Sequence, residues 1–84
     1  MISVFCEICA DVWRVFSMGV EDLDNGEIFA PTPGELCAKL TGMRRVVSIM
    51  WYSDMLSDVE SEIIRNLISD CRAYIREHEI FWED

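Results

Sequence analysis

The chain has 84 residues, of which 51% are hydrophobic, so it fits one folded domain (residues 1–84) and is too apolar to be intrinsically disordered. Sixteen acidic residues against seven Lys and Arg give a net charge of −9, which argues against direct binding to nucleic acid or to an anionic membrane. No catalytic motif is present, and we therefore expect neither an enzyme nor a bound cofactor.

The first segment is predicted to form a helix over about residues 3–18, ended by Gly19. Its polar residues recur every three or four positions and trace one narrow stripe: Ser3, Glu7, Asp11, Arg14 and Ser17. A strand over residues 2–12 is the alternative, because apolar residues alternate there, but the alternation fails at Arg14. Charges interrupt the segment and no basic start precedes it, so we expect a cytoplasmic protein rather than a membrane span or a signal peptide.

Residues 19–32 are predicted to be an acidic connector. Asn25-Gly26 is a strong hairpin signal, which favours a short ribbon of Val20–Leu23 against Glu27–Phe29. The segment from Glu21 to Ile28 resembles part of a calcium loop. Leu23 and Thr32 occupy positions where such a loop needs oxygen ligands, so we expect an acidic turn instead.

A second helix is predicted over about residues 33–53, because Thr32 is a suitable N-cap, Pro33 suits the first position and Glu35 completes a capping box. An apolar seam follows at helical spacing: Leu36, Leu40, Met43, Val47 and Met50. Gly42 weakens this helix by about 1 kcal/mol. If the helix ended there, Val46–Tyr52 would become a strand, and the fold would be α+β.

A third helix is predicted over about residues 58–79, because Ser57 and Glu60 form another capping box. Its apolar face consists of Ile63, Ile64, Leu67, Ile68, Cys71, Tyr74, Ile75 and His78. The lone histidine, His78, lies near the helix end, where a protonated ring complements the helix dipole. The sequence therefore predicts a mainly α fold, a small three-helix bundle.

Four cysteines, Cys6, Cys9, Cys37 and Cys71, are predicted to be reduced and to act as small apolar residues. The alternative is a zinc-stabilised module in which all four thiolates bind the metal, which would help a domain this small. Structural zinc sites usually offer two close pairs of ligands, whereas only Cys6 and Cys9 are close in this sequence. We expect no metal.

The acidic residues suggest a protein partner with a basic surface, such as one that holds nucleic acid. We expect contact through acid clusters and exposed aromatic residues: Glu21, Asp22, Asp24, Glu27, Phe29, Asp58, Glu60, Glu62, Phe81 and Trp82. Small acidic proteins without enzymatic motifs include phage and mobile-element inhibitors such as anti-CRISPR proteins, a comparison of kind and not of sequence. The alternative is an obligate helical oligomer, such as a homodimer, since the apolar faces are wide.

Overall fold

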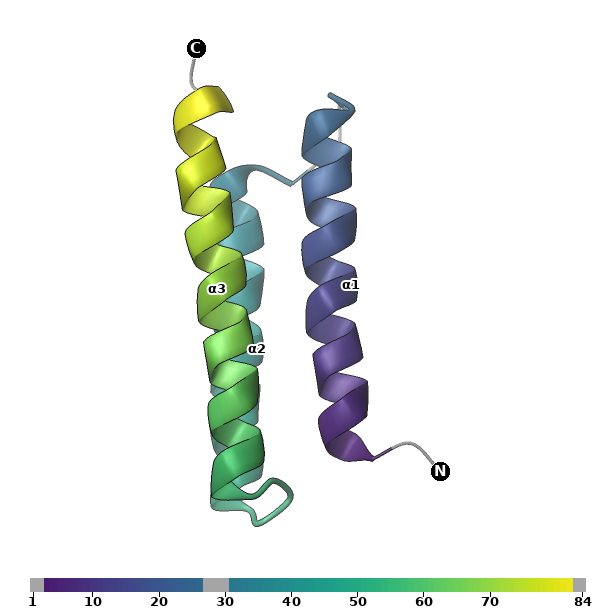
Figure 1. Ribbon diagram of the computed structural model, residues 1–84, viewed down its shortest axis with the longest axis vertical. Coiled ribbons are helices and arrows are strands. Elements are labelled where there is room, and N and C mark those ends of the chain that lie inside the picture. Colours follow the sequence, from purple (N-terminus) through teal and green to yellow (C-terminus); the bar gives the residue numbers. More distant parts are fainter. Residues whose placement is uncertain (1–2, 27–30, 83–84) are drawn as a thin grey trace.

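Three α-helices form the protein in a computed structural model that describes residues 3–26 and 31–82, with side chains to residue 77. They are α1 (Val4–Asp24), α2 (Pro33–Tyr52) and α3 (Asp58–Trp82). The chain runs up, down and up, so α1 and α3 are parallel and α2 is antiparallel to both (Figure 1). No strand occurs within these residues. The predicted three-helix fold is confirmed, and the α+β alternative is wrong because Val46–Tyr52 lies in α2.

Both predicted capping boxes are present and start α2 and α3 at the expected residues. The Glu35 N–H donates to Thr32 Oγ1 at 3.2 Å, and the Thr32 N–H donates to Glu35 Oε2 at 3.4 Å. At α3, the Glu60 N–H donates to Ser57 Oγ at 3.1 Å, and the Ser57 N–H donates to Glu60 Oε1 at 3.0 Å. These bonds satisfy N–H groups that the first helical turn leaves without partners.

Gly19 does not end the first helix, contrary to the prediction. It is buried within α1, which continues to Asp24. A Cβ placed on Gly19 would lie 2.5 and 2.8 Å from the two terminal methyl carbons of Leu36 on α2. The glycine is therefore explained by the close approach of α1 and α2 and not by a helix end.

The Asn25-Gly26 pair ends α1 instead of turning a hairpin. Asn25 is the C-cap, and Gly26 has φ +66° while its N–H donates to the Leu23 carbonyl at 3.2 Å. A glycine with positive φ suits a hairpin turn and the residue after a helix equally well. Val20–Leu23 is helical, so the predicted ribbon is wrong; its second strand, Glu27–Phe29, falls outside the described residues.

The core lies along the line where the three helices meet. Its buried side chains are Val12, Leu36, Leu40, Val47, Leu56, Ile64, Ile68, Cys71 and Ile75. The predicted seam of α2 contributes three of them, and Met43 and Met50 of that seam are half-buried against the core. Ile63 and Tyr74, predicted on the apolar face of the third helix, are 47% and 41% exposed. Both lie at the edge of that face, and Tyr74 meets Phe16 of α1 there with a ring-centre distance of 5.4 Å.

Ser61 is a polar residue in this core. It is fully buried, and its hydroxyl has no hydrogen-bond partner among the described residues. An unsatisfied buried hydroxyl is unfavourable.

Within the described residues, none of the three helices combines the length and the apolar character needed to cross a bilayer.

Candidate functional site

The predicted acidic residues lie at opposite ends of the bundle. Glu21, Asp22 and Asp24 belong to the last turns of α1, whereas Asp58, Glu60 and Glu62 belong to the first turns of α3. Because α1 and α3 are parallel, these ends are separated along the longest dimension of the molecule, which is 44 Å (Figure 1). The structure therefore does not join the two groups into one acidic site.

The remaining predicted contact residues fall where their side chains are not described. Phe81 and Trp82 belong to the last turn of α3, at the same end of the bundle as Glu21, Asp22 and Asp24 (Figure 1). Glu27 and Phe29 lie outside the described residues. Any contribution of these four residues to binding stays a prediction.

Two of the acids at the start of α3 have bonding roles within the fold. The Trp51 indole N–H donates to Asp58 Oδ1, and Glu60 caps its own helix through the Ser57 N–H. The guanidinium of Arg65 lies 5.7 Å from the centre of the Trp51 ring, a cation–π distance. Asp58 and Glu60 are thus explained by local structure, while Glu62 is exposed.

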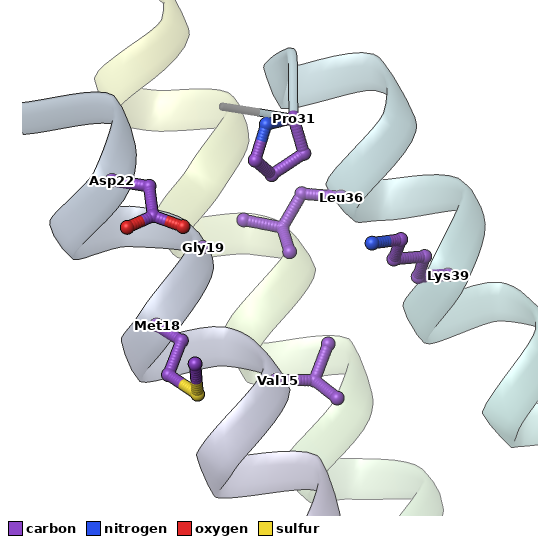
Figure 2. A pocket seen from close by; sticks show the side chains of 7 residues that line it. All are labelled: Val15, Met18, Gly19, Asp22, Pro31, Leu36 and Lys39. Atoms are coloured by element: carbon purple, nitrogen blue, oxygen red, sulfur yellow. The ribbon is translucent and has the colours of Figure 1, made fainter. Parts of the chain in front are cut away.

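A small hollow lies between α1 and α2, beside Gly19 and Leu36 (Figure 2). Asp22 from α1 and Lys39 from α2 border it, and its volume is about 230 Å³. Small-molecule sites usually measure about 300–1,000 Å³. This hollow is therefore smaller than a typical ligand site.

A second hollow, of about 440 Å³, lies on the α2–α3 side. Small residues of α2, including Gly34, Ala38 and Gly42, form its floor, and Arg45 and Arg72 border it. It borders α2, the helix in which bases outnumber acids: Lys39, Arg44 and Arg45 against Glu35. It does not contain any of the predicted site residues.

The third hollow is a groove between α1 and α3, which we call the α1–α3 groove. It measures about 400 Å³ and is lined by Trp13, Phe16, Leu67, Asp70, Cys71 and Tyr74. The Trp13 and Phe16 ring centres lie 5.8 Å apart, and Phe16 meets Tyr74 edge to face at 5.4 Å. Trp13 is nevertheless 59% exposed and Tyr74 41% exposed. A row of packed aromatic rings therefore reaches the surface here.

Asp70 is the one charged residue, of those whose side chains the structure describes, that lines the α1–α3 groove. Among the described residues the one ion pair joins Arg14 to Asp11 at 3.4 Å, so Asp70 has no cationic partner within that part of the chain. Burial, and then the negative charge of Asp70, raise the pKa of the neighbouring Cys71 thiol. The groove thus combines apolar walls with an uncompensated carboxylate.

Sequence reasoning missed this groove because it placed Tyr74 on the apolar face of the third helix and treated Trp13 only as part of the wide apolar face of the first helix. The available signal was the width of those faces, because apolar residues cover most of the circumference of the first helix. A helix in a three-helix bundle packs against two neighbours only, so part of so wide a face must meet solvent. The width alone does not tell which residues are exposed.

The four cysteines come from all three helices and differ in exposure. Cys6 is exposed, Cys9 and Cys37 are half-buried, and Cys71 is buried. The exposure of Cys6 corrects the expectation that every thiol packs in the core. Burial raises the pKa of Cys9, and Cys6 beside it adds to the rise. Within the described residues no group of three or more His, Cys, Asp or Glu side chains is arranged to hold a metal ion.

Comparison of the chain with protein-family models, with curated proteins and with solved structures finds no match.

Proposed function

We propose that this protein binds a larger protein, docks its α1–α3 groove on a basic surface of that partner, and inhibits the partner by excluding nucleic acid. One observation carries the proposal: Trp13 and Tyr74 are exposed in the same groove as Asp70, and no basic residue among those with described side chains lines it. Trp and Tyr are the residues most often found at the energetic centre of protein interfaces. An acidic rim favours a partner of opposite charge.

The distribution of charge supports a preferred orientation for docking. The helix α1 carries five acids against one base, Arg14, whereas α2 carries three bases against one acid. The excess negative charge therefore lies away from α2. In the electric field of a basic partner, the molecule would turn α1 and α3 toward that partner, which raises the association rate.

The test is capture of a partner from a lysate of the native host with immobilised wild-type protein and two aromatic variants. Trp13→Ser alters the groove, and Tyr52→Ser is the matched control, because Tyr52 is 80% exposed and lies on α2. We expect a basic nucleic-acid-binding protein to be captured by the wild type and by Tyr52→Ser but not by Trp13→Ser. Added oligonucleotide should release it, and association should slow as salt rises.

Two outcomes contradict the proposal. One is a partner that both aromatic variants retain equally, which would place the contact outside the groove. The other is a partner whose binding is insensitive to oligonucleotide and to salt, which would mean that the acidic surface serves solubility alone. Circular dichroism of each variant shows that the helices are intact, so that a loss of capture reports on the surface.

Self-association is the second candidate function, favoured by exposed apolar residues on α2 and the turn after it. Val46, Ile49, Tyr52 and Met55 are 53%, 64%, 80% and 55% exposed. Exposed apolar patches often mark interfaces. Light scattering decides between the two: a homodimer that Ile49→Ser dissociates supports this function, and a monomer at all concentrations contradicts it.

A further inference from the structure

Near the turn between α2 and α3, the Trp51 side chain contacts both a guanidinium and a carboxylate. Arg65 lies 5.7 Å from the centre of the Trp51 ring, and the Asp58 carboxylate accepts the hydrogen bond of the same indole. The ring face attracts the cation through its quadrupole, and the carboxylate on the ring edge makes the indole more electron-rich. Trp51 thus has its cation within the chain.

Trp13 shares its groove with a carboxylate, and no cation–π contact to its ring occurs among the described residues. It lies in the α1–α3 groove with Asp70, and the other described lining residues are Phe16, Leu67, Cys71 and Tyr74. The basic residues of α3 are directed elsewhere: Arg65 contacts Trp51, and Arg72 borders the hollow on the α2 side. Arg76 follows Arg72 by four positions and so shares its side of the helix.

We propose that the α1–α3 groove receives an arginine side chain of the partner, with its guanidinium stacked on Trp13 and paired with Asp70. This inference rests on the proposed function and specifies the chemistry of its central contact. Charge complementarity points to a cation, because the part of the groove that the structure describes has a carboxylate and no base. Arginine fits better than lysine, because a guanidinium is planar, weakly hydrated and able to stack on a ring while it bonds to a carboxylate.

The test uses the full-length, isotope-labelled protein and small probes in nuclear magnetic resonance titrations. The probes are N-acetyl-arginine methylamide, its neutral isostere N-acetyl-citrulline methylamide, and N-acetyl-lysine methylamide. We expect the arginine probe to shift the Trp13 indole signal and the backbone signals of residues 70–74. The citrulline probe should not shift these signals, and the lysine probe should bind more weakly.

Variants assign the response to the groove. Asp70→Asn should weaken the arginine probe about two- to fivefold, the range for an exposed ion pair. Trp13→Leu should abolish the shifts, because it keeps an apolar side chain and removes the ring. Glu62→Gln is the matched control: it makes the same charge change at an exposed position of α3 that lies outside the groove, and it should leave binding unchanged.

Three results would overturn the inference: no shift with the arginine probe, equal shifts with citrulline or lysine, or equal effects of Asp70→Asn and Glu62→Gln. The capture experiment separates this failure from failure of the proposed function. If partner capture depends on Trp13 but the arginine probe does not bind, the groove binds a partner through another group. If capture does not depend on Trp13, the proposed function fails by itself.

Discussion

The substitution Gly19→Ala tests why α1 and α2 approach so closely. In an open helical site, alanine in place of glycine stabilises a helix by about 1 kcal/mol. At Gly19 the new Cβ would lie 2.5 and 2.8 Å from the terminal methyl carbons of Leu36, well inside van der Waals contact. Leu36 is only 1% exposed, and Figure 2 shows its side chain between α1 and Pro31. The clash must therefore displace a core side chain.

The net effect follows from two opposing contributions. Overpacking of a core costs about 1–3 kcal/mol, and the short distances to two carbons place this contact in the upper part of that range. The helix propensity of alanine offsets about 1 kcal/mol of it. We therefore expect a net loss of about 1–2 kcal/mol, from a total of about 4–13 kcal/mol for a chain of this length. The melting temperature should fall by about 4–8 °C for each kcal/mol.

Urea unfolding followed by circular dichroism measures this loss, and Gly42→Ala is the matched control. Gly42 is also within a helix, but a Cβ there would meet nothing within 4 Å, so alanine should stabilise by up to about 1 kcal/mol. In a Leu36→Val background, which shortens the opposing side chain, the penalty of Gly19→Ala should shrink. If Gly19→Ala stabilised the protein as much as Gly42→Ala, the packing explanation would be refuted.

Two further predictions concern buried groups of α3. Ser61→Ala should raise the free energy of unfolding by about 1 kcal/mol, because it removes an unsatisfied buried hydroxyl. Ser69→Ala, at an exposed position of the same helix, is the control. An equal gain in stability at both sites would contradict this explanation. Burial raises the pKa of Cys71, so the neutral thiol is favoured in the folded state, and its contribution is complete below the ordinary thiol pKa of about 8.5. That contribution is lost as pH rises through the higher folded pKa. Urea midpoints measured from pH 7 to 10 should therefore fall more steeply in the wild type than in Cys71→Ala. Equal slopes in the two proteins would contradict this prediction.

The starts of α2 and α3 and most of the core residues could be predicted from the sequence alone. A capping box joins residues three apart, so Thr32 with Glu35 and Ser57 with Glu60 could be recognised without any knowledge of neighbours. The seam of α2 obeys the helical period across Gly42, and this periodicity outweighed the strand propensity of Val46–Tyr52. These signals are local, and local geometry was enough to interpret them.

For the functional surface, the sequence determined the excess of acid but not its arrangement. Asp24 is the last residue of α1 and Asp58 is the first residue of α3. Because the bundle makes α1 and α3 parallel, these two acids lie at opposite ends of the molecule. The sequence also named exposed aromatic residues near the connector and the C-terminus. Trp13 and Tyr74, the described aromatic residues that reach the surface of the groove, are not among them, and Tyr74 is predicted on the apolar face of the third helix.

The role of Gly19 and the existence of the α1–α3 groove depend on how the helices pack against one another. A glycine is equally suited to ending a helix and to letting another helix approach, and Leu36, which distinguishes the two, lies on a different helix. Similarly, Trp13 and Val12 are adjacent and both apolar, yet Val12 points to the core and Trp13 to its edge. Each helix packs against two neighbours, and the position of those neighbours fixes which part of a wide apolar face is left for a partner.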